Sequence, residues 1–464
     1  MTQLRFNPLM MVDSYKLSHS PLYPKIEGMS SYITARTNGL DVMVPFGIQL
    51  FVKKFMLTKL EQWMVDELEE FAKLHGEPFD RVPFDYIVDT YGYFPVTIRS
   101  VKEGLPIASG KVLVRIECTD PTVAWIVSYL ETAMLRVVWY ATTIATNDRY
   151  NKQDLARWYL RTGADLAGLA FALHDFGGRG VSSGETAEIG GAAHLVNFMG
   201  SDTVEGIRAA NFYYNDKMAG FSVPATEHSI ECSWGGTDLE EDAYLSHVLT
   251  TYAKPGAIVS IVIDGYDVYR AAAKLCTKFK EQIIASGAKV VFRPDSGDML
   301  EVVPRILKMQ ADAFGYKFTS TGHAKINYVG LLQGDGVDRD SMNKLLHNLE
   351  VLGYSADNVV FGSGGALLQK VNRDTYKFAQ KASAILVDGV WKPIAKNPIT
   401  DKGKKSLAGR YEAYKSLITG EVMDINIDTG TISNEFSCLM HTVYQNGKLY
   451  NETTLANVRE LAAL

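Results

Sequence analysis

The segment Gly362-Ser363-Gly364-Gly365 has the composition of a loop that binds an anion. Glycines let the backbone approach a ligand closely, and the first amides of a following helix, expected over residues 366–371, can donate hydrogen bonds to a phosphate. A tight turn without a ligand would use the same residues. The sequence has no Walker A motif, and Gly334 and Gly336 lack the third glycine of the dinucleotide fingerprint, so neither of those two nucleotide sites is expected.

Three aspartates, Asp264, Asp295 and Asp335, each follow a short apolar run. Carboxylates in such positions could hold Mg²⁺ that is coordinated mainly by a polyphosphate. Capping of a helix is the simpler explanation for any one of them. Three carboxylates at the ends of three expected strands favour a functional role for the set.

His228 follows Glu227 directly. An imidazole can act as a nucleophile or a proton carrier, and an adjacent carboxylate could set which nitrogen carries the proton. A structural role explains this histidine equally well.

Four arginines lie in segments that contain glycine, serine or aspartate rather than on an expected solvated helix face: Arg36, Arg179, Arg293 and Arg373. Arginine suits bidentate recognition of phosphate and stacking on planar rings. Phe176, which precedes Gly177, could offer an aromatic face to a heterocycle or belong to the core. These residue types are suited to a phosphorylated small molecule.

The elements that must position these residues are short strands. Seven apolar runs, each ending in a cluster of Gly, Asp, Ser, Arg or His, recur at spacings of roughly 20–40 residues with helix-permissive stretches between them. The runs cover residues 169–173, 194–198, 221–224, 258–263, 290–292, 328–332 and 359–361. This alternation predicts an α/β barrel of about seven parallel strands, in which the polar clusters meet at the carboxyl-terminal rim. Turn formation explains one or two clusters, but not the recurrence of arginine, histidine and aspartate in nearly all of them.

The two ends of the chain do not show this alternation of strand, loop and helix. Strand-like runs at residues 95–98, 111–116, 436–443 and 448–450 predict a second, β-rich domain. We expect this domain to comprise residues 1–165 plus 380–464, and the barrel to comprise residues 166–379. Residues 123–145 are mostly apolar, but Glu131 and Arg136 lie in the middle, which favours a buried or subunit-contacting helix over a membrane span.

Composition excludes several classes of protein. The 464 residues include 47 basic and 53 acidic ones, so the net charge is −6, which argues against nucleic-acid binding through bulk positive charge. The four cysteines lie far apart, so a disulfide scaffold or a zinc finger is not expected and a reducing cytoplasm fits. No secretory signal is expected at the N-terminus.

Several polar clusters belong to longer motifs: His174-Asp175-Phe176-Gly177, Gly200-Ser201-Asp202-Thr203, Glu227-His228-Ser229, Arg293-Pro294-Asp295-Ser296-Gly297, Gln333-Gly334-Asp335-Gly336 and Phe361-Gly362-Ser363-Gly364-Gly365. Together with Asp13-Ser14-Tyr15-Lys16, they resemble the nicotinamide phosphoribosyltransferases, a family of type II phosphoribosyltransferases. The resemblance runs from Asn7 to about Val443, nearly the whole chain.

The resemblance implies an incomplete α/β barrel with a β-rich domain, working as a homodimer with active sites at the subunit interface. It implies a reaction of NAD salvage in which nicotinamide and 5-phosphoribosyl-1-pyrophosphate give nicotinamide mononucleotide and pyrophosphate. Mg²⁺ and basic residues would stabilise the leaving pyrophosphate, and ATP would be hydrolysed in a coupled step.

The resemblance also implies roles for individual residues. Phe176 and Tyr15 of the partner subunit would stack on the two faces of the pyridine ring, with Arg293 nearby. Asp202 would accept a hydrogen bond from the carboxamide, and its charge would repel nicotinate. ATP would phosphorylate His228, which Glu227 and Asp264 would orient.

The remaining residues would bind the phosphoribosyl pyrophosphate. Its 5-phosphate would meet Gly364, Gly365, Arg373 and Lys381. Its pyrophosphate would face Arg36, Arg179, Lys396, Lys404 and Arg410. Asp295, Gly334 and Asp335 would meet the ribose hydroxyls and the metal-bound diphosphate, which makes Asp295 and Asp335 the candidate Mg²⁺ ligands.

Three other functions compete with this one. A nicotinate phosphoribosyltransferase would share the fold and the ATP coupling, and Asp202 discriminates between the two. A catalytically silent barrel that binds phosphosugars or a partner protein would not need His228, Asp295 and Asp335. An aldolase-like barrel would need a Schiff-base lysine, and no lysine ends an expected barrel strand.

Overall fold

A computed structural model describes residues 4–37, 41–397 and 406–463 of the chain. The chain divides into two compact units. We call Asn147–Ala209 with Lys217–Lys370 the barrel unit, and Met1–Thr146 with Ala210–Asp216 and Val371–Leu464 the sheet unit. Helices α5 (Glu131–Thr162) and α7 (Val204–Tyr213) have residues in both units.

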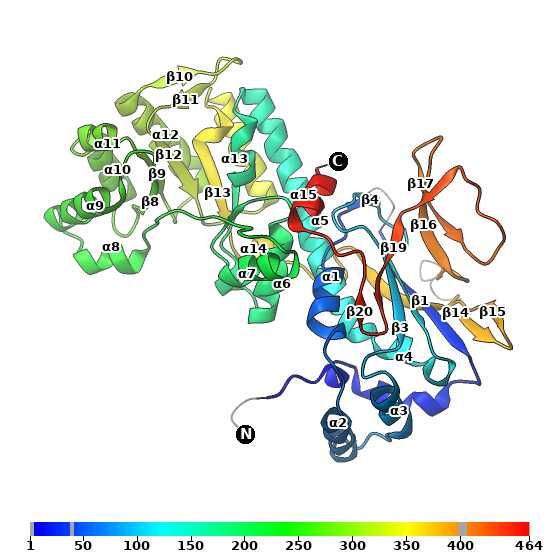
Figure 1. The fold of residues 1–464 in the computed structure, drawn as a ribbon. Helices are drawn as coiled ribbons and strands as arrows, with labels where there is room; N and C mark the ends of the chain where they lie inside the picture. The colour runs from blue at the N-terminus through cyan, green and yellow to red at the C-terminus, as the bar shows by residue number, and fades with distance from the viewer. Residues whose placement is uncertain (1–3, 38–40, 398–405, 464) are drawn as a thin grey trace. The chain divides into compact units, whose positions relative to one another are not determined.

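Among the described residues, six parallel strands form the main sheet of the barrel unit, in the order β7-β6-β13-β12-β9-β8. Four of them, β8, β9, β12 and β13, are labelled in Figure 1. Their bounds are β6 (Leu173–Asp175), β7 (Gly200–Ser201), β8 (Ile258–Val262), β9 (Lys289–Arg293), β12 (Val329–Gln333) and β13 (Val359–Ser363). Their central residues are almost all buried, as expected for a parallel sheet that is covered on both faces.

The segment 221–226 connects the two edges of this sheet. The Phe221 amide donates to the Met199 carbonyl (2.8 Å), and the Ser201 amide donates to the Phe221 carbonyl (3.1 Å) at the β7 edge. At the β8 edge, the Ser260 amide donates to the Pro224 carbonyl (2.9 Å), and the Thr226 amide donates to the Ser260 carbonyl (3.0 Å). The sheet therefore curls into a ring of seven segments, of which the seventh forms only bridges.

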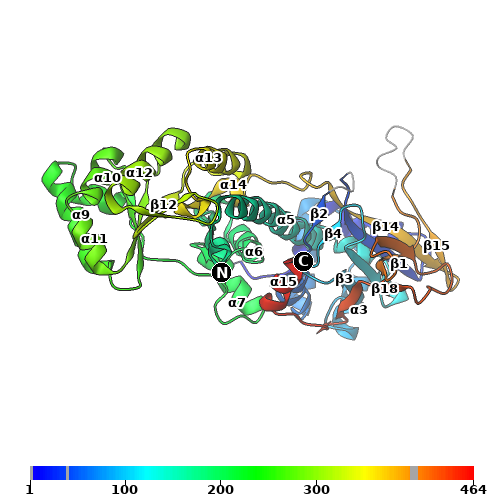
Figure 2. The ribbon, with the colours of Figure 1, turned by 90° about the horizontal axis from the view of Figure 1, so that it is seen from above.

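The helices of the barrel unit follow the strands in sequence. They are α6 (Gly184–His194), α8 (His228–Trp234), α9 (Asp238–Tyr252), α10 (Val268–Cys276), α11 (Lys280–Ser286), α12 (Met299–Phe314), α13 (Arg339–Val351) and α14 (Gly365–Leu368), and a hairpin of β10 (Tyr316–Phe318) and β11 (Ala324–Ile326) follows α12. Helix α13 runs beside the C-terminal half of α5 (Figure 2), where the Trp158 indole donates to Asn343 Oδ1 (2.7 Å).

Three of the seven predicted strands differ from the structure. The run 194–198 is the end of α6 and a turn, and the strand is β7, two residues later. The run 169–173 is mostly a 3-10 helix (Leu166–Phe171), so β6 begins only at Leu173. The run 221–224 is the bridging segment rather than a strand. A buried apolar run has the same composition in a strand and in a helix end, so hydrophobicity alone did not distinguish them.

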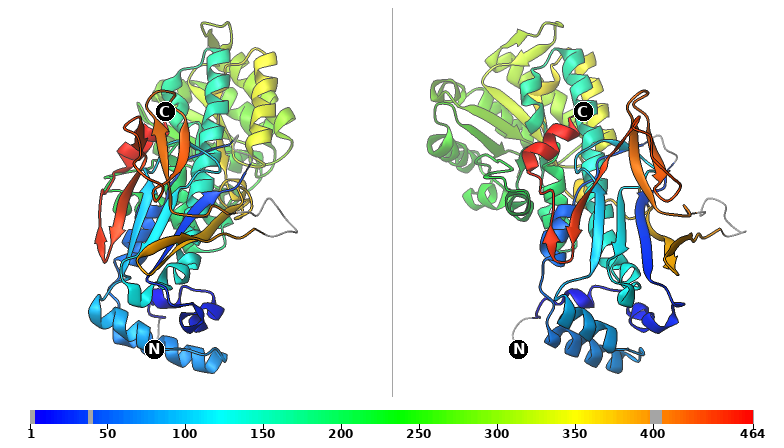
Figure 3. Two further views of the ribbon diagram at one scale, coloured as in Figure 1. Left: turned by 90° about the vertical axis from the view of Figure 1, so that its right-hand side faces the viewer. Right: turned by 45° about the vertical axis from the view of Figure 1, so that its right-hand side comes forward.

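The sheet unit contains an antiparallel sheet in the order β15-β14-β1-β5-β3-β19-β20. Figure 3 shows strands from the start of the chain, in blue and cyan, beside orange and red strands from its end. The bounds are β1 (Gly28–Ala35), β3 (Val96–Val101), β5 (Val114–Cys118), β14 (Phe378–Val387), β15 (Val390–Pro393), β19 (Met440–Gln445) and β20 (Lys448–Leu449). The predicted fold class, an incomplete α/β barrel of about seven strands with a β-rich domain built from both chain ends, is confirmed, with the bridging segment 221–226 in place of a seventh strand.

Smaller elements complete the sheet unit. They are a three-stranded sheet of β16 (Tyr411–Ser416), β17 (Val422–Asn426) and β18 (Phe436–Cys438), a pair of β2 (Val42–Met43) and β4 (Ile107–Ala108), and helices α1 (Ile48–Phe51), α2 (Gln62–His75), α3 (Val82–Thr90), α4 (Ile126–Tyr129) and α15 (Leu455–Ala462).

The apolar stretch 123–145 is helical and mostly buried. Its two helices are α4 and the first half of α5, and the Lys16 ammonium donates to the Glu131 carboxylate (2.8 Å) at the start of α5. In the part of the chain that the structure describes, no helix is long and apolar enough to cross a membrane.

Candidate active site

A cavity of about 330 Å³ opens among the loops that follow the strands of the barrel unit. Its lining includes nine of the residues predicted for the site: Phe176, Arg179, Asp202, Arg293, Asp295, Gly334, Asp335, Gly364 and Gly365. Gly178, Gly180 and Thr203 complete the lining. Residues up to about 190 positions apart in the sequence therefore meet at one rim, because the carboxyl ends of parallel strands share one edge of the sheet.

The backbone around Phe176 is held from two sides. The Phe176 amide donates to the Ser363 carbonyl (2.9 Å), and the Gly177 amide donates to Asp175 Oδ1 (2.7 Å). Asp175 is fully buried, and burial raises the pKa of its carboxyl. The Phe176 ring packs directly on Gly362, where an added Cβ would overlap the ring atom Cε2. The position of this aromatic face thus depends on a glycine of the neighbouring strand.

The guanidinium of Arg293 lies over the same ring, with its carbon 5.3 Å from the ring centroid. Arg293 also pairs with the Asp295 carboxylate (3.4 Å), while its Nε is buried without a hydrogen-bond partner among the described residues. Gly334 makes room for this pair, since an added Cβ there would come within 2.8 Å of Asp295 Oδ1. A planar ring on Phe176 would therefore lie beside a cation.

Asp202 supplies a carboxylate to the cavity. Its amide donates to the Asp175 carbonyl (2.9 Å), and its Oδ1 accepts a hydrogen bond from the Ser222 hydroxyl. The buried Asp175 thus links the backbone of the Phe176 loop to that of the Asp202 loop. Ser222 was not predicted as a site residue, and it lies within the run 221–224 that was predicted as a strand.

The glycine-rich loop differs from the prediction in one respect. Helix α14 comprises only the four residues Gly365–Leu368 rather than residues 366–371, so a single helical turn follows the loop. Gly180 and Gly365 approach each other closely, since a Cβ on Gly180 would lie 3.1 Å from the Gly365 nitrogen. The loop can hold an anion through close backbone approach, with Arg179 as the nearby cation.

His228 lies outside the cavity lining, at the first position of α8. Its Nε2 forms a hydrogen bond with Asp264 Oδ1 (2.9 Å), and the Ser296 hydroxyl donates to Asp264 Oδ2 (2.5 Å). Of the two acids expected to orient the imidazole, Asp264 makes the contact, whereas Glu227 accepts a hydrogen bond from the Ser229 hydroxyl.

Arg179 lines the cavity of the barrel unit, whereas the other described basic residues predicted for phosphate and pyrophosphate belong to the sheet unit. Burial lowers the pKa of Lys381 on β14, Glu131 opposes this shift, and the charges of Arg36, Lys396 and Arg373 add to it, so these four basic side chains form one cluster. Arg36 donates to the Lys377 carbonyl (3.2 Å), and Arg373 pairs with Asp374 (3.3 Å). Lys404 lies outside the described residues.

Two further predicted residues lie in the sheet unit. Arg410 donates to Asp428 Oδ1 (2.5 and 2.9 Å) and lies over the Trp391 ring, 4.4 Å from its centroid. Tyr15 is 54% exposed and packs edge-on against His19. Apart from His228 and its two predicted partners, the predicted site residues therefore fall into two groups, one around the cavity of the barrel unit and a basic one on the sheet unit.

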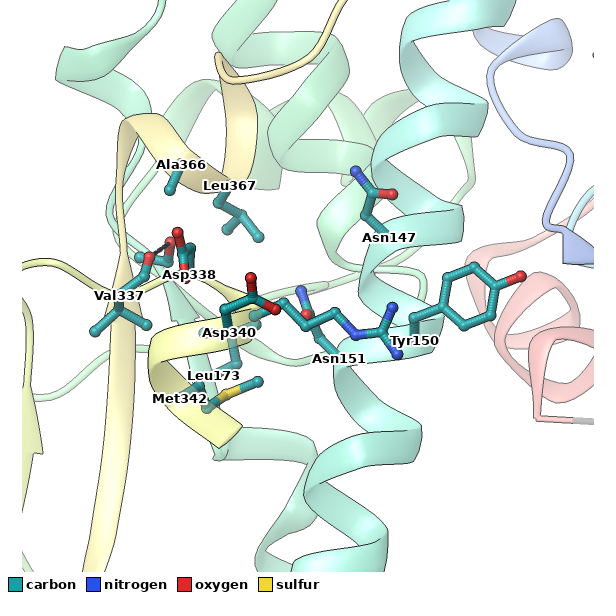
Figure 4. Close-up of a pocket in the computed structure, with 12 residues that line it drawn as sticks. Asn147, Tyr150, Asn151, Leu173, Val337, Asp338, Asp340, Met342, Ala366 and Leu367 are labelled. Atoms are coloured by element: carbon teal, nitrogen blue, oxygen red, sulfur yellow. Dashed lines mark hydrogen bonds between the residues drawn. The ribbon is translucent and has the colours of Figure 1, made fainter. Parts of the chain in front are cut away.

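A second cavity of the barrel unit, of about 270 Å³, is lined by side chains from α5, the start of α13 and the segment 363–367 (Figure 4). The guanidinium of Arg339 lies over the Tyr150 ring, 5.1 Å from its centroid, and pairs with Asp154 (2.7 Å). None of the residues predicted for the site lines this cavity.

The curled barrel with its separate antiparallel sheet is the fold of the type II phosphoribosyltransferases. The crystal structure of nicotinate-nucleotide pyrophosphorylase from Pyrococcus furiosus has a TM-score of 0.63 and 15% identity, covering 100% of this chain and 97% of that one. The crystal structure of human nicotinic acid phosphoribosyltransferase has a TM-score of 0.62 and 16% identity, covering 97% and 92%.

Sequence comparison shows to which family of phosphoribosyltransferases the chain belongs. The model of the nicotinate phosphoribosyltransferase (NAPRTase) family matches residues 171–448, and that of the nicotinamide phosphoribosyltransferase N-terminal domain matches residues 7–98. The nicotinamide phosphoribosyltransferase of Xanthomonas campestris pv. campestris is 43% identical, covering 98% of this chain and 97% of its own, and that of Acinetobacter baylyi is 30% identical, covering 99% and 97%. The chain belongs to the NAPRTase family and is a pentosyltransferase.

Proposed function

We propose that this enzyme transfers the phosphoribosyl group of 5-phosphoribosyl-1-pyrophosphate to nicotinamide, giving nicotinamide mononucleotide and pyrophosphate in NAD salvage. The observation that carries the choice of pyridine is Asp202, whose carboxylate lines the same cavity as the Phe176 ring. A carboxylate accepts a hydrogen bond from an amide NH₂ and repels the carboxylate of nicotinate. The two bacterial relatives and the N-terminal domain match support the same choice.

The cavity suits the transfer step. The pyridine ring stacks on Phe176 beside Arg293, and its nitrogen attacks the anomeric carbon while the bond from that carbon to pyrophosphate breaks. Gly334, Asp295 and Asp335 face the ribose, and the loop of Gly364 and Gly365 receives the 5-phosphate. Holding both reactants at one rim makes the attack effectively intramolecular.

The acidic residues of the cavity fit a hard cation. Asp295 and Asp335 offer carboxylate oxygens at one rim, and Mg²⁺ typically takes one or two protein carboxylates together with substrate phosphates. When bound there, Mg²⁺ would neutralise charge on the leaving pyrophosphate.

ATP coupling is proposed to act through His228. A carboxylate can only accept, so Asp264 holds the proton on Nε2 and leaves the Nδ1 lone pair for attack on the γ-phosphorus of ATP. The side chain of His228 is 46% exposed, whereas that of Asp264 is 2% exposed, so the imidazole is accessible and its partner is shielded.

We further propose a homodimer, which the family resemblance implies. The basic cluster of the partner subunit, with its Tyr15, would complete the cavity of the barrel unit. Arginine and lysine side chains would then neutralise the pyrophosphate.

Steady-state rates with nicotinamide and with nicotinate test the proposal, in the presence of phosphoribosyl pyrophosphate and Mg²⁺, with and without ATP. We expect nicotinamide to be preferred, and Asp202→Asn to reduce the ratio of the two kcat/KM values by about tenfold to a hundredfold. The control is Asp312→Asn on α12, where the aspartate is exposed. A preference for nicotinate in the unmodified enzyme would establish the competing assignment.

A further inference from the structure

Glu231 is a buried carboxylate next to the proposed phosphate acceptor, and it belongs to none of the motifs that the sequence shows. It lies three residues after His228 on α8, so the two side chains project from the same face of the helix. Glu231 is only 2% exposed. One nitrogen of His228 and one carboxylate oxygen each of Glu231 and Asp264 lie within 4.8 Å of one another.

The Glu231 carboxylate holds the turn that carries Asp264. Its Oε2 accepts a hydrogen bond from the Gly265 amide (2.9 Å), and its Oε1 has no hydrogen-bond partner among the described residues. Gly265 leaves just enough room, since an added Cβ would come within 2.5 Å of Glu231 Oε2. The half-exposed imidazole is thus backed by two carboxylates that are shielded from water.

The charge state of the Glu231 carboxyl depends on its burial and on the groups around it. Burial raises the pKa of its carboxyl to about 7, the Gly265 amide and His228 oppose the rise, and Asp264 and Glu241 add to it. The titratable or charged groups that face it are Asp264, His228, Glu241, Tyr244 and Tyr266. Glu231 is therefore neutral in mildly acidic solution and ionised above neutral pH.

We propose that Glu231 is a positioning residue for phosphorylation of His228, which holds the Asp264–Gly265 turn and, once ionised, stabilises the cationic imidazole ring. This inference rests on the proposed ATP coupling. As the Nδ1 lone pair forms its bond to the γ-phosphorus, the bond from that phosphorus to the β-phosphate oxygen breaks and ADP leaves with the electron pair. The proton on Nε2 stays in place, so the ring becomes positive and attracts both carboxylates.

The test compares the unmodified enzyme with Glu231→Gln, which keeps an oxygen acceptor for the Gly265 amide but cannot ionise. The measurement is the rate at which γ-labelled ATP labels His228. The ratio of the two rates should be near one at about pH 6, where both side chains are neutral, and rise to about tenfold at about pH 8.5. Glu281→Gln, which changes an exposed glutamate of α11, should follow the unmodified enzyme at both values.

Two results would overturn the role of Glu231. One is a ratio that stays constant with pH, which indicates at most a structural contribution. The other is a labelling rate of the unmodified enzyme that does not rise between the two pH values, and this result requires no variant to fold. If the unmodified enzyme is not labelled at all, the ATP coupling itself fails, which is a separate outcome. ATP-independent transfer by Glu231→Gln reports whether the variant is folded.

Discussion

The cavity of the barrel unit, which is proposed to bind the pyridine ring, and the basic cluster of the sheet unit hold their side chains in different ways. In the cavity, Phe176 and Asp202 are fixed by backbone hydrogen bonds, and the Phe176 ring is also fixed by contact with Gly362. In the basic cluster, Arg373 is a long side chain that pairs with the neighbouring Asp374, and elsewhere in the sheet unit Arg410 pairs with Asp428 in the same way. A flat ring is recognised by shape and needs rigid walls, whereas a pyrophosphate is recognised by charge, which acts over a longer distance.

The largest effect should come from filling the space under the ring. Gly362→Ala would place a methyl group on top of Phe176, so the ring must move. We expect kcat/KM for nicotinamide to fall by about a hundredfold, since small displacements in a positioned site are costly. Gly168→Ala is the matched control, because an added Cβ there meets nothing within 4 Å. An unchanged kcat/KM in Gly362→Ala would contradict the conclusion that Gly362 fixes the position of the Phe176 ring.

A smaller effect is expected from the basic cluster. Lys381→Met should raise KM for phosphoribosyl pyrophosphate by about tenfold, and added salt should narrow the difference. Because burial lowers the pKa of Lys381, the unmodified enzyme should lose affinity for this anion as the pH rises toward that lowered value, and the variant should not. Lys308→Met, which changes an exposed lysine of α12, serves as control. A salt-independent change in KM would indicate that shape rather than charge matters in this cluster.

A conservative change in the same unit should matter less. Arg410→Lys keeps the charge but loses the two hydrogen bonds to Asp428 and the stacking on Trp391. We expect KM for phosphoribosyl pyrophosphate to rise by about threefold, as for an exposed ion pair. An effect as large as that of Gly362→Ala would show that this part of the sheet unit also depends on exact geometry.

The last prediction concerns stability alone. Glu103 of the sheet unit accepts hydrogen bonds from the Ile48 and Gln49 amides and the Tyr214 hydroxyl, and burial raises its pKa to about 7. Its folded-state pKa exceeds the unfolded value, so stability falls as the pH rises between the two, by about 3 kcal/mol. Glu103→Gln should remove this slope in urea unfolding at a series of pH values while leaving activity unchanged. An identical slope in the variant would place the titrating group elsewhere.

Much of the architecture could be predicted because it depends on local patterns. Four of the seven predicted strands, at 258–263, 290–292, 328–332 and 359–361, are confirmed, since apolar runs between polar loops are typical of buried parallel strands. The prediction of a strand at 194–198 was wrong because the end of a buried helix is as apolar as a buried strand. The four-residue length of α14 could not be predicted either, because it depends on how the chain leaves the loop.

The sequence by itself determined which chemical groups stand at the ends of the strands, because residue types and the strand-loop-helix alternation are local properties. Tertiary structure alone decided which groups touch. Asp264 reaches His228 while the adjacent Glu227 does not, Gly362 supports Phe176 from another strand, and Glu231 is buried against the Gly265 turn. These contacts join segments far apart in the chain, and their distances follow from the curvature of the sheet and the packing of α8, which no local pattern encodes.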